Sequence, residues 1–335
     1  MGWSTSTPQR VGVAALDDAV MGTPATRKNQ RTAATNGDSS SPASSGRFQR
    51  LEVLGAGTFG VVYRARDRRT GEIVAVKCLR ASDGAGDAER YLSDFASEVS
   101  ALEACSGHPS IVQPRASGQL DSGAFLAMEF VGPTLRHVMK HVRFGRRHTE
   151  LEVRLLMRQL LAGERRMNRL GLMHRDLKPE NVLHGRRPPY SNPIGTRGYR
   201  VPEILLGSTD YDERVDSWAL GVMMAELLAG RHPFHGRSDM DHLSEILALL
   251  GTADIKEWSG YDGRRLPSGC QLGSFLRNKF PCPTKARIKG PPTLSEAGFE
   301  VLSALLRCNP EKRLTAEQAL KHRWFKDTKP RAIRR

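Results

Sequence analysis

Residues 174–181 read His-Arg-Asp-Leu-Lys-Pro-Glu-Asn, or HRDLKPEN in one-letter code. Within eight positions this stretch carries a carboxylate that can act as a base, a lysine that can neutralise phosphate charge and an amide that can bind a metal ion. A match of eight consecutive residues to a known catalytic motif is much more specific than a match to a single glycine-rich run. It is the strongest indication of fold and function in the 335 residues of the chain.

A second stretch, Leu54–Tyr63, contains glycines with the spacing G-x-G-x-x-G. Dinucleotide-binding folds share this spacing, but in those folds the glycines open a helix. Here Val61–Arg66 continues as a predicted strand, and after a turn Ile73–Lys77 is predicted to be the next strand. The pattern therefore predicts a β-hairpin with a glycine-rich tip, whose backbone N–H groups can approach phosphates because no Cβ intervenes.

Together with Val74-Ala75-Val76-Lys77, these stretches resemble the signature of the eukaryotic protein kinases. The resemblance covers about Phe48 to Phe325, and its details are most similar to cyclin-dependent kinases, with a plant group as a candidate. It implies an α+β fold with two lobes, a small N-lobe formed by a β-sheet plus one helix and a larger, mostly helical C-lobe. The implied activity is transfer of the γ-phosphoryl group of ATP to a serine or threonine of a protein substrate, with Mg²⁺ as the metal.

The resemblance also implies roles for single residues. In the catalytic loop, Asp176 would accept the proton of the substrate hydroxyl, Lys178 would neutralise the phosphoryl group and Asn181 would hold a magnesium ion. Lys77 would reach the α- and β-phosphates of ATP, and Glu98 would pair with this lysine. The residues that would surround the nucleotide are Leu54, Gly55, Gly57, Gly60, Val62, Ala75, Lys77, Met128, Glu129, Val131 and Leu183.

Hydrophobic periodicity predicts further elements that fit this architecture. They are helices over 90–104, 151–170 and 216–228, a strand that starts at His108 and a strand over 124–131 that enters the hinge between the lobes. Near the end of the chain, residues 309–316 resemble the closing motif of the family. This resemblance predicts an ion pair between Arg313 and Glu203.

One part of the signature is absent. After His184 a kinase is expected to have two short strands and then Asp-Phe-Gly, yet no aspartate occurs between Asp176 and Asp210. The substrate-docking motif returns in register at Gly195–Glu203, so an internal block is missing near 185–190. The lost aspartate would bind the magnesium that bridges the β- and γ-phosphates. Loss of several kcal/mol of stabilisation would slow transfer by about a thousandfold.

Three interpretations stay open. The chain is a serine/threonine kinase with impaired turnover, a pseudokinase that uses the fold for binding or as a scaffold, or the product of a coding sequence that has lost the Asp-Phe-Gly block. By its spacing to Thr196, Ser191 aligns with the activating phosphosite of cyclin-dependent kinases. Residues 93–97 stand where these kinases carry their cyclin-binding helix motif, and the difference argues against a cyclin-like partner.

Changes in composition along the chain indicate the domain boundaries. Residues 1–47 are rich in Ser, Thr, Ala and Gly and have almost no large apolar residues after Val20, which predicts disorder. The kinase domain is expected over 48–325, with the N-lobe at 48–131 and the C-lobe at 132–325, and residues 326–335 form a basic tail.

The same composition bears on partners and compartment. Five cysteines form no CxxC pair, so neither a zinc site nor a disulfide framework is indicated. The net charge of +15 is interpreted as solvated basic faces, because no aromatic residues are interleaved for base stacking, and no nucleic acid partner is expected. No apolar run reaches the length of a membrane span, and no signal peptide is recognised, so the cytoplasm or the nucleus is expected.

Overall fold

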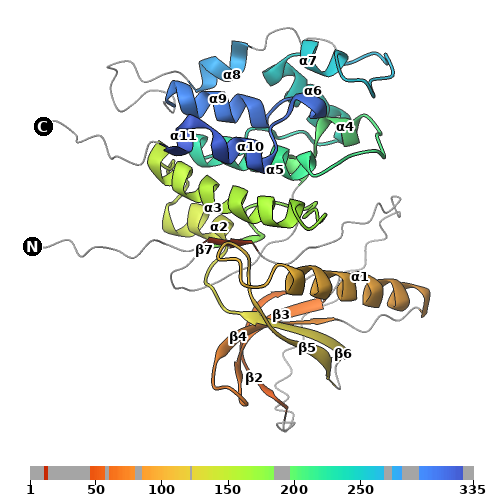
Figure 1. Ribbon diagram of the computed structural model, residues 1–335, viewed down its shortest axis with the longest axis vertical. Coiled ribbons are helices and arrows are strands. Elements are labelled where there is room, and N and C mark those ends of the chain that lie inside the picture. Colours follow the sequence, from red (N-terminus) through yellow and green to blue (C-terminus); the bar gives the residue numbers. More distant parts are fainter. Residues whose placement is uncertain are drawn as a thin grey trace, which may run out of the picture.

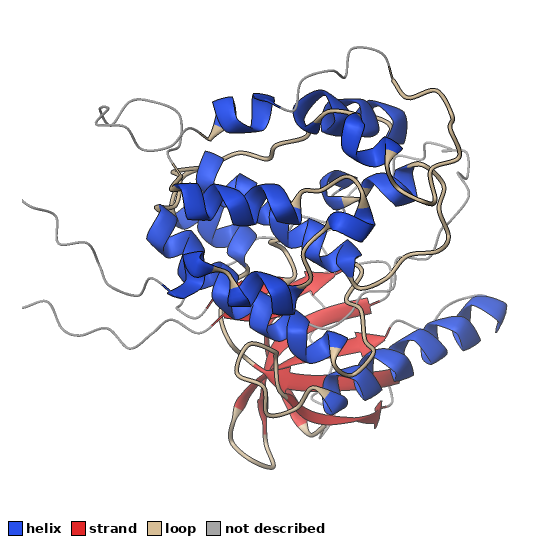
Figure 2. Cartoon of the chain, turned by 45° about the horizontal axis from the view of Figure 1, so that its top comes forward, coloured by secondary structure: helices blue, strands red, loops and turns tan. Residues whose placement is uncertain are grey.

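The structure, a computed structural model, describes residues 11–13, 46–56, 60–79, 85–120, 123–184, 197–267, 274–280 and 294–326. Figure 1 shows two lobes, a twisted β-sheet with one long helix at the bottom and a larger group of helices at the top. Figure 2 shows the same division by colour, with most strands in the small lobe and nearly all helices in the large one. The predicted two-lobed α+β architecture is therefore confirmed.

Five strands form the antiparallel sheet of the N-lobe, in the order β2-β3-β4-β6-β5. Side chains alternate between the two faces of this sheet, as expected for strands. Val74, Val76 and Cys78 of β4 enter one buried cluster, whereas Leu79 enters a second cluster that includes the helix α1. The strands are β2 (Phe48–Ala56), β3 (Gly60–Asp67), β4 (Ile73–Leu79), β5 (Pro114–Leu120) and β6 (Gly123–Glu129).

The helix of the N-lobe, α1 (Ala85–Ala104), begins five positions before its predicted start at residue 90. Its Phe95 and Leu102 are buried in the same cluster as Leu126 and Met128 of β6. Residues 95, 98, 99 and 102 lie on one face of a helix, because its period is 3.6 residues. The same periodicity that packs α1 on the sheet therefore directs Glu98 inward, and this residue is only 6% exposed.

The strand predicted to start at His108 begins instead at Pro114, which is a correction to the sequence prediction. Side-chain hydrogen bonds hold the intervening residues in a turn. The side-chain amide of Gln113 donates to the carbonyl oxygens of His108 (3.0 Å) and Ile111 (2.7 Å). The Ser110 N–H donates to His108 Nδ1 at 3.2 Å. Such local bonds compete with strand pairing, and an apolar pattern does not reveal them.

The C-lobe is built around α5 (Arg214–Ala229), in which nearly every side chain is buried. A helix that is apolar all round is expected in the centre of a domain. Trp218 and Met223 on α5 are fully buried in one large cluster with α3 (Glu150–Asn168). The other described helices are α2 (Leu135–His137), continued by a π-helical turn (Val138–Val142), and α4 (Pro202–Leu205), α6 (Asp239–Leu250), α7 (Ala253–Lys256), α8 (Ser274–Lys279), α9 (Glu296–Leu305), α10 (Ala316–Lys321) and α11 (Arg323–Lys326), with short 3-10 turns at Arg197–Tyr199 and Pro310–Lys312. No helix among these described residues is long and apolar enough to cross a membrane.

Helix α3 delivers the chain to residues 174–181. It starts with a capping box, in which the Glu152 N–H donates to the Thr149 hydroxyl (3.3 Å) and the Thr149 N–H donates to the Glu152 carboxylate (2.7 Å). Reciprocal bonds of this kind satisfy N–H groups that the first helical turn leaves unpaired. The predicted helix over 151–170 is thus observed with its start fixed at Glu150.

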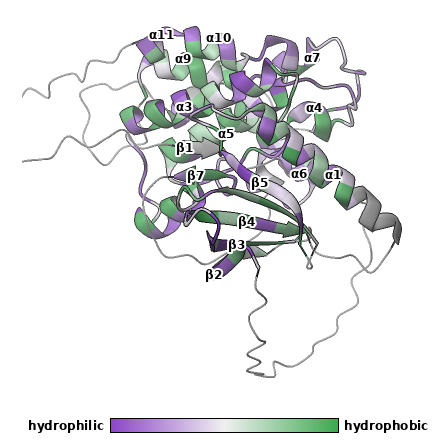
Figure 3. Ribbon diagram, turned by 60° about the horizontal axis from the view of Figure 1, so that its bottom comes forward, coloured by the Kyte–Doolittle hydropathy of each residue, from purple (hydrophilic) through white to green (hydrophobic). Residues whose placement is uncertain are grey.

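A second, two-stranded sheet lies between the lobes. Strand β7 (Val182–His184) follows the HRDLKPEN stretch and pairs antiparallel with β1 (Val11–Val13). Figure 3 shows β1 and β7 together on the side of the helical lobe that faces the sheet. The prediction of disorder over 1–47 is therefore wrong for these three residues, because strand pairing depends on a distant partner and composition does not register one.

The predicted ion pair between Arg313 and Glu203 is formed in the core of the C-lobe. The two guanidinium nitrogens of Arg313 donate to the two carboxylate oxygens of Glu203 at 2.8 and 2.9 Å. The side chains are 0% and 1% exposed. The contact joins α4 to the segment before α10, which is distant in the sequence.

Glu203→Gln is expected to lower the free energy of unfolding by about 3 kcal/mol, because it leaves the buried Arg313 charge without its counterion. Urea unfolding measured by circular dichroism checks this value. Asp239→Asn is the matched control, since its ion pair with Arg200 is more than half exposed and contributes at most about 1 kcal/mol. Equal losses in the two variants would contradict the assigned role of the buried pair.

Candidate functional site

The HRDLKPEN stretch forms a loop whose backbone is hydrogen-bonded to the side chain of Asp216, near the start of α5. The backbone N–H groups of His174 and Arg175 donate to the two carboxylate oxygens of Asp216 at 2.6 and 2.8 Å. Burial raises the pKa of Asp216, while His174 and the N–H bonds from both residues act in the opposite direction. Arg175 has a φ of 64°, in the left-handed region that a residue with a Cβ rarely adopts. The carboxylate therefore fixes an unfavourable backbone turn.

Asp216→Asn is expected to lower the rate of the phosphoryl transfer predicted from the sequence by roughly tenfold to a hundredfold. Weakening hydrogen bonds to a buried charged group costs about 1.5–3 kcal/mol, and about 1.36 kcal/mol of barrier is a factor of ten in rate. Rates of phosphate transfer for the variant and the parent chain give the measurement. Asp212→Asn is a suitable control, because Asp212 lies in the loop just before α5 and its side chain is 45% exposed. A rate for Asp216→Asn as high as that of the control would contradict this bracing role.

Two side chains of the loop converge on Asp176. Lys178 Nζ lies 2.5 Å from Asp176 Oδ2. The side-chain amide of Asn181 donates to the Asp176 carbonyl oxygen at 2.9 Å and to Oδ2 at 3.0 Å. Because the nitrogen of Asn181 is engaged in this way, its Oδ1 is the atom that is available as a cation ligand.

Lys77 and Glu98 form the other charged pair of the site. Lys77 Nζ lies 2.7 Å from Glu98 Oε2, and the two side chains are 14% and 6% exposed. The pair joins β4 to α1, which are close in space because Phe95 and Leu102 pack on the sheet. The structure thus brings together the lysine and the glutamate that the sequence singled out, with the helix swung toward the sheet.

The register of the sheet aligns the predicted nucleotide-lining residues. Val62 lies opposite Lys77, and Ala75 lies opposite Met128, so these four side chains share one face. Gly55 of β2 lies opposite Val62, with Leu54 next to it in the same strand. The sequence alone predicts each strand, whereas this lateral alignment depends on pairing.

The floor of the site comes from the hinge and the C-lobe. Val131 and Leu183 both pack against the cluster that contains Met128. Glu129, the last residue of β6, is partly buried, and its backbone N–H donates to the Gln113 carbonyl oxygen at 2.9 Å. Residues from both lobes therefore meet where the adenine of ATP is expected.

Of the glycines in the predicted phosphate loop, Gly57 lies outside the described residues. Gly60 lies at the start of β3, where an added Cβ would overlap the carbonyl oxygen of Cys78 on the neighbouring strand. This position requires glycine for the close approach of β3 and β4. Ser191 and the shortened stretch over 185–190 also lie outside the described residues.

The oxygen atoms near Asp176 suit magnesium in kind but are few. Magnesium binds through one or two protein oxygen ligands and keeps waters and substrate phosphates as the others. The Asn181 Oδ1 and the Asp176 carboxylate have this chemistry. Elsewhere in the described part of the chain, no group of three or more His, Cys, Asp or Glu side chains is arranged to hold a metal ion. The residues present therefore fit a magnesium ion held largely by the nucleotide.

A buried network at Arg136 was not predicted from the sequence. Its Nε lies 2.7 Å from Glu180 in the catalytic loop, its Nη2 donates to the Tyr199 hydroxyl at 3.0 Å, and Nη1 pairs with Glu226 of α5. Burial alone would lower the pKa of Arg136, but Tyr199, Glu226 and Glu180 together raise it above its ordinary value. The network connects the catalytic loop to the segment that follows the shortened stretch. Arg136 belongs to no short motif, so only the structure identifies it.

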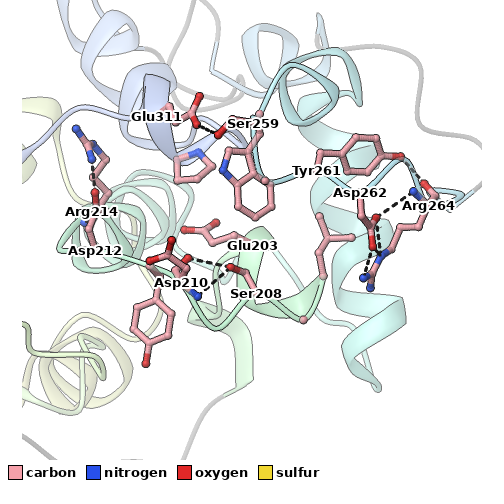
Figure 4. A pocket seen from close by; sticks show the side chains of 16 residues that line it. Glu203, Ser208, Asp210, Asp212, Arg214, Ser259, Tyr261, Asp262, Arg264 and Glu311 are labelled. Carbon is pink, nitrogen blue, oxygen red and sulfur yellow. Dashed lines mark hydrogen bonds and ion pairs between the residues drawn. The ribbon is translucent and has the colours of Figure 1, made fainter.

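A separate pocket of about 360 Å³ lies in the C-lobe, beyond α4 (Figure 4). Two ion pairs lie within the lining, Asp262 with Arg264 at 2.5 Å and Asp212 with Arg214. None of its lining residues belongs to the catalytic loop or to the Lys77–Glu98 pair. The pocket is therefore distinct from the candidate site.

Comparison with known proteins yields a family match and several relatives. A family model described as "Protein kinase domain" matches residues 48–325. A protein of Oryza sativa subsp. japonica with the provisional name cyclin-dependent kinase F-2 is 44% identical over 313 residues, which cover 85% of this chain and 92% of the relative.

Two further relatives have different lengths. Cyclin-dependent kinase G-1 of Oryza sativa subsp. indica is 37% identical over 303 residues, 84% of this chain but only 42% of the relative. Cell division control protein 2 homolog 3 of Trypanosoma brucei brucei is 35% identical over 300 residues, 84% of this chain and 92% of the relative. The chain thus spans less than half the length of the G-1 relative.

Proposed function

Because the chain belongs to the protein kinase family and its relatives are cyclin-dependent-kinase-like, we propose that it binds ATP with Mg²⁺ and phosphorylates serine or threonine residues of proteins. The observation that carries this proposal is the simultaneous assembly of two charged groups, Lys77 with Glu98 and Asp176 with Asn181. These groups come from different lobes and from distant parts of the sequence.

In this proposal each group has a positional task. Glu98 holds the Lys77 ammonium group in place to bind the α- and β-phosphates, and Ala75 and Met128 line the adenine site. The Asp176 carboxylate orients the acceptor hydroxyl and takes its proton, while Lys178, 2.5 Å away, balances negative charge on the phosphoryl group. Asn181 Oδ1 would hold a magnesium ion, which supplies charge neutralisation when bound.

Transfer is proposed to be slow. No aspartate lies between Asp176 and Asp210 to take the place of the metal-binding aspartate of the Asp-Phe-Gly block. Since phosphoryl transfer depends on positioning and charge neutralisation, loss of one such ligand lowers the rate by about a thousandfold. An assay of phosphoryl transfer must therefore be sensitive enough to detect this slow rate.

The proposal is tested by incubating the chain with radiolabelled ATP, a generic basic protein and Mg²⁺ or Mn²⁺. Label in phosphoserine or phosphothreonine above the level of a heat-denatured sample supports it. Absence of label with both metals, at enzyme concentrations that would detect a thousandfold impairment, would exclude kinase activity for this chain.

A pseudokinase is the second candidate, favoured by the missing aspartate. Such a module would bind nucleotide weakly and without requiring metal, and would act through its surfaces. Thermal-shift titration with ATP, with and without Mg²⁺, separates the two candidates. Stabilisation that requires Mg²⁺ supports the kinase, and stabilisation that is indifferent to Mg²⁺ supports the pseudokinase.

The expected partners follow from the same site. A protein substrate is proposed, and a membrane or nucleic acid partner is not. Residues 93–97 of α1, Ser-Asp-Phe-Ala-Ser, stand in place of the cyclin-binding motif, so action without a conventional cyclin contact is proposed. The cytoplasm or the nucleus is the proposed compartment.

A further inference from the structure

Strand β1 (Val11–Val13) lies outside the segment that matches the kinase family, 48–325, yet it is part of the layer beneath the active site. It pairs with β7 in the register Val13 to Val182, Gly12 to Leu183 and Val11 to His184. It also lies against α3, the helix that leads into the catalytic loop. Figure 3 shows β1 beside β7 and below α3.

Strand β7 has a partner on its other edge as well. The His184 N–H donates to the Pro133 carbonyl oxygen at 2.7 Å, and Thr134 forms a bridge with Leu183. Polar backbone groups of successive strand residues point to opposite edges. The N–H and C=O of Leu183 therefore point away from Pro133 and toward Gly12 of β1.

The backbone N–H and C=O groups on this edge of β7 need a hydrogen-bond partner other than water. Val182 is fully buried, and Leu183 is partly buried against the cluster around Met128. Buried N–H and C=O groups need a hydrogen-bond partner. In the family pattern short strands are expected at this point before Asp-Phe-Gly, and the sequence after His184 lacks this block. The C-lobe therefore lacks the sequence that would pair with this edge of β7, and β1 pairs with the edge instead.

The direction of β1 relates it to the catalytic loop. Because the pairing is antiparallel, β1 runs toward Val182, which directly follows Asn181. Asn181 is the residue that bonds Asp176 and would hold the metal ion. Any restraint on Val182 by β1 is therefore transmitted to Asn181 through a single peptide bond.

We propose that residues Val11–Val13 are a replacement strand, which completes the β7 sheet in cis and thereby fixes Asn181 and Leu183 in the nucleotide site. The consequence for nucleotide binding rests on the proposed function, whereas the strand pairing itself does not. The occupant is this chain's own segment, because residues 14–47 tether it to the kinase domain. A covalent connection raises the effective concentration of the strand well above that of a strand from another molecule.

The test is Gly12→Pro in the full chain, with Gly12→Ala as the matched control. Proline removes the N–H that faces the Leu183 carbonyl oxygen, which weakens the pairing and so exposes the neighbouring Leu183 N–H, whereas alanine keeps the N–H at position 12. Amide hydrogen exchange at Leu183 is expected to accelerate about fivefold to tenfold in the proline variant, the scale of one lost backbone hydrogen bond. Exchange at Leu160 in α3 should not change, which shows that the lobe remains folded.

A synthetic peptide spanning residues 6–18, added to the proline variant, is expected to restore protection at Leu183 and the ATP affinity of the parent chain. Unchanged exchange at Leu183 in Gly12→Pro would overturn the replacement strand, whatever the chain does with ATP. Faster exchange with unaltered ATP affinity would overturn the positioning of Asn181 and Leu183. If neither chain binds ATP while exchange and its rescue follow the prediction, the proposed function fails and the replacement strand stands.

Discussion

Asp176→Asn is expected to reduce phosphate transfer to a serine-containing peptide by about 10²–10⁴-fold, the usual contribution of a positioned general base. Asparagine has nearly the same shape and can keep the bond to the Asn181 side chain, but it cannot take the proton of the acceptor hydroxyl. The Lys178 ammonium group, 2.5 Å from the carboxylate, would also lose its counterion. The variant should therefore lose turnover while it remains folded.

The measurement compares initial rates of phosphopeptide formation at saturating ATP. Asp239→Asn serves as control, because its side chain is 58% exposed on α6 and it takes no part in the site. A thermal-shift curve on each variant establishes that the fold is retained. If Asp176→Asn transferred phosphate as fast as the control, Asp176 would not be the base.

Lys77→Met is expected to weaken ATP binding by about 10–100-fold, since a hydrogen bond to a charged phosphate is equivalent to about 1.5–3 kcal/mol. It should also lower the free energy of unfolding by about 3 kcal/mol, because Glu98 is only 6% exposed and loses its ion-pair partner. Calorimetric titration with ATP and urea unfolding provide the two values.

The double variant Lys77→Met/Glu98→Gln separates the two effects. Removing the Glu98 charge is expected to recover much of the lost stability, because no uncompensated carboxylate remains, but not the affinity for ATP. Arg264→Met is the control, as its pair with Asp262 is more than half exposed on both sides and lies away from the site. Recovery of ATP affinity in the double variant would show that Lys77 does not contact the phosphates.

The site could be predicted from the sequence where its signals are local. In the HRDLKPEN stretch, Asp176, Lys178 and Asn181 contact one another within six residues, so their arrangement depends on nearby sequence. Helix α5 was recognisable because its residues are apolar on all sides. The Glu203 partner of Arg313 was found from the family pattern, since the two residues lie 110 positions apart and no local rule connects them.

Other features depend on pairing that a linear pattern does not contain. Strand β1 has only three residues, and its partner β7 is distant in the sequence, so no local pattern predicts it. Arg136 was indistinguishable from other surface arginines until folding placed Glu180, Tyr199 and Glu226 around it. The late start of β5 at Pro114 follows from side-chain bonds of Gln113, which a hydrophobicity pattern omits.

The Lys77–Glu98 and Asp176–Asn181 groups are proposed to form a working, though slow, phosphoryl-transfer site. A single-turnover experiment tests this proposal most directly: the chain in excess over radiolabelled ATP and Mg²⁺, with matched peptides that differ only in serine, threonine or tyrosine as the acceptor. Label is expected on serine and threonine, with little on tyrosine, and it should be lost in Asp176→Asn. Equal label in the chain and in Asp176→Asn, or none in either, would contradict it.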